Sequence, residues 1–368
     1  MATNVPIMKV NETVEKLSCC YEQLIKAHLP LKDMPSVMLW GPPGIGKSQL
    51  VRELADEMGK RTGKRVHVTD VRLILFNPVD LRGIPTSNAE KTLSVWLKPK
   101  IFDMDASDEV LNILFLDEIS AAPQSVQAAA YQITLDRVIG EHKLPENCIV
   151  IAAGNRVTDR SVAYKMPRAL ANRLMHIEIA PDFSSWCEWA VRSGINEKVL
   201  GFLSFKQDYL NEDEITSDDL AFPTPRSWEM VSKILNQVSG DLKFAYPLIC
   251  GLVGSGVASE FNAWCKIYKG LPNIDDIFCG KRVSVPRSTD QLYALTSSMI
   301  ARARECQDNV KQIEYSLDYA LQMPPDFACV LLKGYQNISD DFAKKLMQIP
   351  TYMKWLNTRG KLLNGIVK

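Results

Sequence analysis

Residues 41–48 read Gly41-Pro42-Pro43-Gly44-Ile45-Gly46-Lys47-Ser48. They match the pattern G-x-x-x-x-G-K-[ST] at every fixed position. An apolar, strand-like stretch precedes them at 36–40, and apolar residues at helical spacing follow from 48 to 58, with Gly59 as the expected helix end. A strand, a glycine-rich loop and a helix are the setting in which backbone N–H groups surround a phosphate. The sequence therefore predicts a phosphate-binding loop.

The residue types of this loop indicate what each part does. The glycines let N–H groups turn towards a phosphate, and the start of the helix adds partial positive charge. Lys47 is expected to reach the β- and γ-phosphates of ATP, and the Ser48 hydroxyl is expected to bind Mg²⁺. The predicted nucleotide-contacting residues are Gly41, Pro42, Pro43, Gly44, Ile45, Gly46, Lys47, Ser48 and Gln49.

A nearly continuous apolar run at 111–116 ends in two carboxylates, Asp117 and Glu118. Such a run is typical of a strand that is buried on both faces of a parallel sheet. Ligands of open α/β sheets bind at the carboxyl ends of the strands. We therefore expect Asp117 to hold Mg²⁺ through water and Glu118 to polarise a water molecule for attack on the γ-phosphate.

A second apolar run, at 148–153, is followed by Gly154 and Asn155. Asn155 is a neutral polar residue at the carboxyl end of a strand expected beside the Asp-Glu strand. It is placed to hydrogen-bond the attacking water or the γ-phosphate. The alternative is an asparagine that simply favours the turn after a glycine; the functional role is preferred here.

Helix and strand patterns alternate through the first half of the chain, which predicts an α/β fold with a mostly parallel sheet of about five strands. The further elements expected are helices at 11–28 and 123–135, strands at 65–71 and 175–179, and a short helix with a hairpin within 80–99.

After Pro181 the pattern changes to helices and loops. Residues 211–219 form an acidic loop, and Pro225 is expected at the first position of a helix that contains Arg226. A second glycine-rich stretch at 251–256 lacks the Lys-Ser ending. We interpret it as close helix packing and not as a second phosphate site.

Composition limits the function classes. The chain has 368 residues, with 43 Lys+Arg and 43 Asp+Glu, so its formal charge is zero. That balance does not favour a nucleic-acid surface, although it leaves room for a local basic patch. No apolar run approaches the length of a membrane span. Nine cysteines without a C-x-x-C pair indicate reduced thiols and a cytoplasmic protein, and the four scattered histidines do not suggest a metal site.

Taken in order, these motifs resemble those of the AAA+ ATPases, and in particular the MoxR branch and its dynein-related relatives. The segments that carry the finer likeness are 80–85, 169–174 and 224–228. The resemblance implies a P-loop AAA+ core, a parallel five-stranded sheet in an αβα sandwich, over 1–181 with a hairpin insert near 80–99. It also implies an all-α lid over 182–285 and a C-terminal helical extension over 286–368.

The same resemblance implies an ATPase that works as a homo-oligomer, usually a hexameric ring with ATP bound between neighbours. Asn155 would be sensor 1, Arg173 the arginine finger that reaches the neighbour's γ-phosphate, and Arg226 sensor 2. Leu174 stands where the family often has phenylalanine, so Arg168 stays a rival for the finger. Whether Arg226 serves its own nucleotide or a neighbour's is left open.

From the family we expect a machine that remodels or activates a partner protein, one that carries a von Willebrand A domain. One alternative is a nucleic-acid-directed translocase or restriction-type motor, which zero net charge weighs against. Another is a scaffold that senses nucleotide without hydrolysing it. The intact Glu118 argues against that scaffold.

Overall fold

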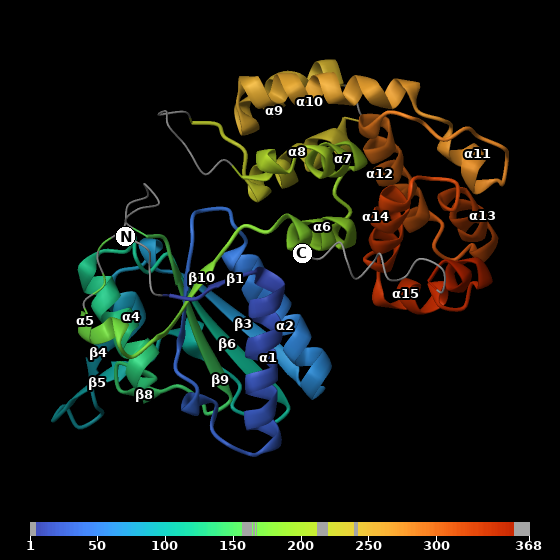
Figure 1. Ribbon diagram of the computed structural model, residues 1–368. Helices are drawn as coiled ribbons and strands as arrows, with labels where there is room; N and C mark the ends of the chain where they lie inside the picture. The colour runs from blue at the N-terminus through green and yellow to red at the C-terminus, as the bar shows by residue number, and fades with distance from the viewer. Residues whose placement is uncertain are drawn as a thin grey trace. The chain divides into compact units, whose positions relative to one another are not determined.

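The computed structural model describes residues 5–156, 164, 166, 168–211, 220–238 and 242–356. The chain divides into two compact units, Met1–Asp182 and Phe183–Lys368. The first unit combines a sheet with helices, and the described part of the second is helical (Figure 1). The acidic loop predicted at 211–219 lies, apart from Asn211, outside the described residues. A further boundary near 285 stays a prediction.

A six-stranded, all-parallel sheet forms the centre of the first unit. The sequence indicated about five strands. The additional one is β1, which has two residues and is too short for alternation to reveal. The strands, in their order across the sheet, are β1 (Ile7–Met8), β10 (Met175–Ile179), β2 (Val37–Trp40), β9 (Cys148–Gly154), β6 (Val110–Asp117) and β3 (Arg65–Arg72).

Helices cover both faces of this sheet (Figure 1). Helices α1 (Val10–Lys26) and α2 (Lys47–Thr62) share one core with side chains such as Phe115 of β6. Helix α4 (Gln124–Asp136) shares the other core with the neighbouring Leu114. Successive side chains of a strand point to opposite faces, so β6 is apolar at consecutive positions because both of its faces are buried.

Helix α2 is longer than its sequence pattern indicated. It passes through Gly59 and ends at Gly63, which has a φ of 69°. The expected end at Gly59 was therefore wrong. A glycine inside a helix costs about 1 kcal/mol relative to alanine, whereas side-chain contacts beyond it favour continuation: Nε of Arg61 lies 2.6 Å from Oε1 of Glu57 one turn earlier. Gly63 supplies the left-handed conformation that ends a helix without steric cost.

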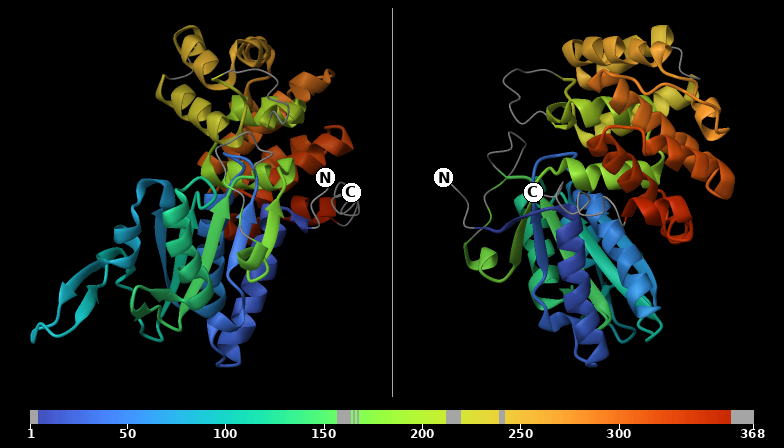
Figure 2. Two further views of the ribbon diagram at one scale, coloured as in Figure 1. Left: turned by 90° about the vertical axis from the view of Figure 1, so that its left-hand side faces the viewer. Right: turned by 45° about the vertical axis from the view of Figure 1, so that its right-hand side comes forward.

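The insert near 80–99 consists of α3 (Pro78–Arg82) and an antiparallel hairpin of β4 (Ile84–Ser87) and β5 (Ser94–Leu97). The hairpin extends away from the main sheet (Figure 2). Its base is tight, because a Cβ added to Gly83, whose φ is 92°, would lie 2.0 Å from the carbonyl oxygen of Leu97.

A second hairpin, which the sequence reading missed, supports that base. It consists of β7 (Val138–Ile139) and β8 (His142–Lys143). Nε2 of His142 lies 2.9 Å from the carbonyl oxygen of Trp96 in β5. Strands of two residues carry too little periodicity to be recognised in a sequence.

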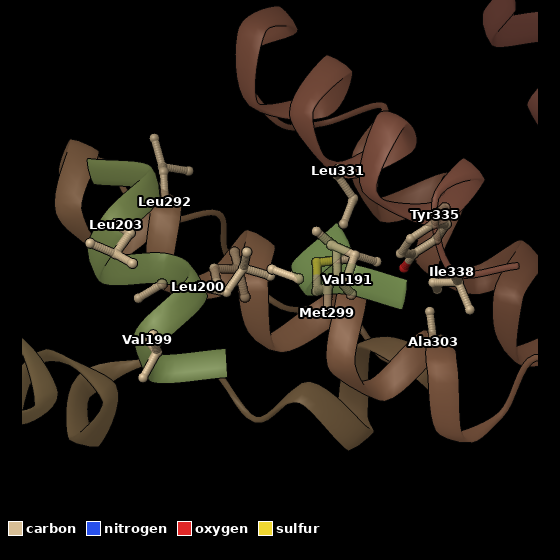
Figure 3. Close-up of a cluster of buried hydrophobic side chains, with 14 of the residues drawn as sticks. Val191, Val199, Leu200, Leu203, Leu292, Met299, Ala303, Leu331, Tyr335 and Ile338 are labelled. Carbon is tan, nitrogen blue, oxygen red and sulfur yellow. The ribbon is translucent and has the colours of Figure 1, made fainter. Parts of the chain in front are cut away.

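The second unit encloses its own apolar core. Figure 3 shows part of it, where side chains of α6, α7, α12 and α14 meet around Met299 and Leu331. The described helices of this unit include α6 (Phe183–Ser193), α7 (Glu197–Phe205), α8 (Pro225–Gln237), α9 (Leu242–Val253), α10 (Ser255–Ile267), α11 (Ile274–Phe278), α12 (Thr289–Glu305), α13 (Val310–Ala320), α14 (Pro325–Gln336) and α15 (Asp340–Leu346).

The glycine-rich stretch at 251–256 does not mark close helix packing, contrary to our interpretation of the sequence. A Cβ added at Gly251 or Gly256 would meet no atom within 4 Å, and Gly254, with a φ of 81°, instead turns the chain between α9 and α10. Helices instead approach closely at Gly334 of α14, where an added Cβ would lie 2.3 Å from Cδ1 of Ile300, and at Gly201 of α7, where it would lie 2.6 Å from Oγ of Ser297. No helix among the described residues has the length and apolar character that a membrane crossing requires.

Candidate nucleotide site

The order of the strands locates the site. From β2 the chain runs to β3 at one edge of the sheet, returns through β6 and β9, and then passes β2 to form β10. Ligands of open parallel sheets bind at the carboxyl ends of the strands where the direction of winding reverses. The phosphate loop follows β2, Asn155 follows β9, and Asp117 ends β6. The predicted groups therefore share the edge of the sheet at which such a ligand binds.

Lys47 is the first residue of α2 and is buried. Its Nζ donates hydrogen bonds to the carbonyl oxygens of Gly41, at 2.5 Å, and Pro42, at 2.9 Å. It donates a third, at 2.9 Å, to Oδ1 of Asn155. These contacts hold a positive charge between the loop and the end of β9, beside the N-terminus of α2, where a phosphate group is favoured.

The loop has the backbone conformation that its glycines permit. Gly41, Gly44 and Gly46 have φ angles of 152°, 82° and 106°, in the region that residues with a side chain rarely adopt. Gly46 is the N-cap of α2 and has no side chain that could accept hydrogen bonds from the first N–H groups of the helix. The first N–H groups of the helix are thus left for an anion, because a helix has no internal acceptors for them.

Ser48 and Asp117 form the other half of the site. Oγ of Ser48 donates to Oδ2 of Asp117 at 3.1 Å, and Oδ1 of Asp117 accepts from the backbone N–H of Glu118 at 2.8 Å. Burial and the charge of Asp117 raise the pKa of the Asp70 carboxyl on the adjacent strand β3. Hydroxyl and carboxylate oxygens in a negative environment are suitable ligands for Mg²⁺. The residues present therefore fit the metal that the motif predicts.

Glu118 sits in a strained turn directly after β6. Its φ of 58° is uncommon for a residue that has a side chain. Backbone hydrogen bonds hold the turn: the N–H groups of Ala121 and Ala122 donate to the carbonyl oxygen of Glu118, and that of Ile119 donates to Ala153 at 3.0 Å. Strain of this kind persists where the surroundings determine the conformation, and it often accompanies a functional role.

Ser120, which the sequence reading missed, ties this turn to the end of β9. Its Oγ accepts from the backbone N–H of Asn155 at 2.9 Å. A Cβ added to Gly154 would lie 2.8 Å from that oxygen, so the close approach requires glycine. The signal in the sequence was only a serine two residues after Glu118. Ser120 thus sets the position of Asn155 relative to Glu118.

The predicted arginines lie on exposed elements. Arg168 is the first residue of α5 (Arg168–Ala171), and Arg173 lies in the turn between α5 and β10; both are exposed. Arg226 belongs to the second unit and is the second residue of α8. The structure brings together Lys47, Ser48, Asp117, Glu118 and Asn155 and places the two finger candidates on the surface of the first unit.

Residues 37–180 match the family described as "ATPase family associated with various cellular activities (AAA)". This part of the chain is similar to AAA ATPase domains. The matched region spans the sheet from β2 to β10 and includes the phosphate loop, both carboxylates and Asn155. The predictions of a P-loop AAA+ fold and of an ATPase are confirmed by this match.

The similarities to individual proteins are weaker than the match to the family. The ATPase family gene 2 protein homolog B of Rattus norvegicus is 28% identical over an alignment of 164 residues that covers 41% of this chain and 19% of that protein. A RuvB variant from Thermotoga maritima is 16% identical, with 80% of this chain and 86% of that one covered at a TM-score of 0.33. NtrX from Brucella abortus in complex with ADP is 14% identical, with coverages of 92% and 68% and a TM-score of 0.38.

TM-scores of 0.33 and 0.38 are too low to assign a function to this chain. The chain spans about a fifth of the length of the rat protein.

Proposed function

We propose that this chain hydrolyses ATP in a ring oligomer of the MoxR kind and uses the cycle to remodel a partner protein. The observation that carries the proposal is the convergence of two strand ends on the phosphate loop that follows β2. Asn155, after β9, contacts Lys47, and Asp117, at the end of β6, contacts Ser48. Phosphoryl transfer depends on positioning and charge stabilisation, and this arrangement provides both.

In this mechanism the chain's own residues bind, orient and activate. The loop N–H groups and Lys47 bind the β- and γ-phosphates, and Ser48 and Asp117 would hold Mg²⁺. When bound, Mg²⁺ neutralises charge on the phosphate oxygens. Glu118 accepts a proton from the water that attacks the γ-phosphate, and Asn155 orients that water or the phosphate.

The arginine finger makes hydrolysis depend on assembly. Arg168, the first residue of α5, and Arg173, two residues after its last, are both exposed and thus accessible to a neighbouring subunit. An arginine supplied in trans stabilises the charge of the transition state and is worth about 10³–10⁵ in rate in GTPases. We expect a smaller effect here. Arg226 is proposed as sensor 2, and a hexamer is proposed from the family resemblance.

The β4–β5 hairpin is the proposed contact with the partner protein. Exposed apolar side chains line it, with Ile84 at 60%, Leu93 at 66% and Leu97 at 57% of full exposure. Oδ1 of Asn88 accepts from the N–H of Thr92 at 2.8 Å, which gives the tip a defined shape. Exposed apolar groups on an ordered hairpin suit transient contact with another protein. A von Willebrand A domain partner is proposed from the resemblance.

A trapping experiment tests the proposal. Glu118→Gln should bind ATP without hydrolysing it and should retain the partner in an affinity pull-down from native cells. The matched control is the double variant Glu118→Gln, Lys47→Ala, which should retain neither ATP nor partner. A parent-like turnover by Glu118→Gln would contradict the assignment. Hydrolysis that is stimulated by DNA and falls steeply with salt would instead favour the nucleic-acid motor.

A further inference from the structure

Two aromatic side chains join the strand before the phosphate loop to the segment that carries the finger candidates. Nε1 of Trp40 donates to Nδ1 of His176 at 2.9 Å, and the rings stack with centroids 5.9 Å apart. Nε2 of His176 lies 2.7 Å from the carbonyl oxygen of Ala171. His176 therefore connects β2, β10 and α5 through one imidazole ring.

The protonation pattern of this link follows from its partners. A carbonyl oxygen can only accept, so Nε2 of His176 carries the proton and donates to Ala171. Nδ1 is then free to accept from the indole N–H of Trp40. Both ring nitrogens and the indole N–H are satisfied in one tautomer, which fixes the orientation of the ring between the two segments.

The link joins two segments that carry predicted site residues. Trp40 is followed directly by Gly41, the first residue of the phosphate loop. Ala171 is the last residue of α5, three residues after Arg168 and two before Arg173. A helix as short as α5 is not stable by itself, so its position depends on tertiary contacts. Two such contacts among the described residues are the burial of Leu174 and the hydrogen bond from His176 to Ala171.

We propose that His176 is a positioning residue that fixes the arginine-finger segment to the strand carrying the phosphate loop. A subunit could then present its finger to a neighbour in a defined place relative to its own nucleotide loop. The inference rests on the proposed function, since it requires a finger that acts in trans. A small displacement of a group that stabilises a transition state lowers the turnover rate far more than it weakens substrate binding.

A mixing experiment isolates the finger from the rest of the site. The donor subunit carries Lys47→Ala, so it offers a finger but cannot use ATP. The acceptor carries Arg168→Ala and Arg173→Ala, so it binds ATP but offers no finger. Turnover in the mixture then reports only a donor's finger acting on an acceptor's nucleotide.

His176→Phe is introduced into the donor or into the acceptor. It keeps an aromatic ring and loses both hydrogen bonds. We expect turnover to fall about tenfold when the donor carries the change, with the KM for ATP unchanged, and to be unaffected when the acceptor carries it. His142→Phe in the donor is the matched control, because His142 also contacts a backbone carbonyl but lies at the hairpin base. It should leave turnover unchanged.

Equal turnover with His176 and His176→Phe donors, or an equal loss from the acceptor change, would overturn the positioning role. If the donor with intact His176 restores no turnover, the trans-acting finger itself is wrong and the positioning role falls with it. Should His176→Phe fail to fold, Trp40→Phe in the donor takes its place. It removes one hydrogen bond, keeps a ring, and should give a smaller loss in the same direction.

Discussion

Nζ of Lys47 donates a 2.9 Å hydrogen bond to Oδ1 of Asn155, and so joins the helix after the phosphate loop to the end of the neighbouring strand β9. The two residues are far apart in the chain and meet because β2 and β9 pair in parallel, with Trp40 opposite Gly154. Lysine binds phosphate as a positive charge, and the neutral amide leaves that charge available.

Asn155→Asp should weaken ATP binding, because a carboxylate beside Nζ would form an ion pair that competes with phosphate for the ammonium group. We expect the Kd for ATP to rise about tenfold or more. Asn155→Ala is the matched variant. It should change Kd little and lower kcat, since it removes only the orienting amide. Titration calorimetry and steady-state kinetics separate the two effects, and equal Kd values for both variants would contradict the charge argument.

Glu118→Gln and Glu118→Asn should both lower kcat by about 10²–10⁴-fold, because each removes the carboxylate that activates water. Their stabilities should differ. The φ of 58° at this position suits asparagine better than glutamine. We therefore expect the free energy of unfolding to be about 0.5 kcal/mol higher for Glu118→Asn, measured by urea denaturation with ATP absent. A less stable Asn variant would show that the turn relaxes around the side chain.

Deletion of Ala89–Lys91 should abolish partner remodelling and leave basal ATP hydrolysis intact, because the hairpin tip lies outside the cluster of nucleotide-site residues. The control is Glu90→Ala, which keeps the length of the tip. Hydrolysis is followed by phosphate release, and partner retention by pull-down in the Glu118→Gln background. If the deletion leaves remodelling unchanged, the hairpin is not the contact surface.

Leu331→Ala should destabilise the second unit by about 2–5 kcal/mol, because the side chain is fully buried between helices (Figure 3) and its removal leaves a cavity. Leu248→Ala makes the same chemical change on α9, where Leu248 is 47% exposed. It should change stability by no more than about 0.5 kcal/mol. Denaturant unfolding, followed by tryptophan fluorescence, measures both. Similar losses would mean that another surface covers α9.

The cysteines predict a pH-dependent pattern of thiol labelling. Cys19, Cys20 and Cys279 are exposed, whereas burial raises the pKa of Cys148 to about 11. Only a thiolate reacts, so Cys148 should stay unlabelled in the folded protein when the pH is raised from about 7 to 9, while the exposed thiols are labelled. Denaturant should make all nine cysteine thiols accessible to the labelling reagent. Cys148→Ser is the control and should leave native labelling unchanged; rapid labelling of Cys148 in the folded protein would contradict its burial.

The longer elements could be predicted from sequence and the shorter ones could not. The buried runs that became β6 and β9, and the motif that became the loop before α2, were recognised within one or two residues. The strands β1, β7 and β8 have two residues each and carry no periodicity. The expected helix end at Gly59 was wrong because contacts made after it, such as the ion pair of Arg61 with Glu57, continue the helix.

The local sequence by itself determined the phosphate loop and the strand ends that carry Asp117, Glu118 and Asn155. Glycine spacing and uninterrupted apolar runs are properties of short stretches of chain. Only the tertiary structure decided that Ser120 holds Asn155, and that His176 joins Trp40 to Ala171. Those contacts join segments brought together by the pairing of parallel strands, and no short stretch of sequence encodes such a pairing by itself.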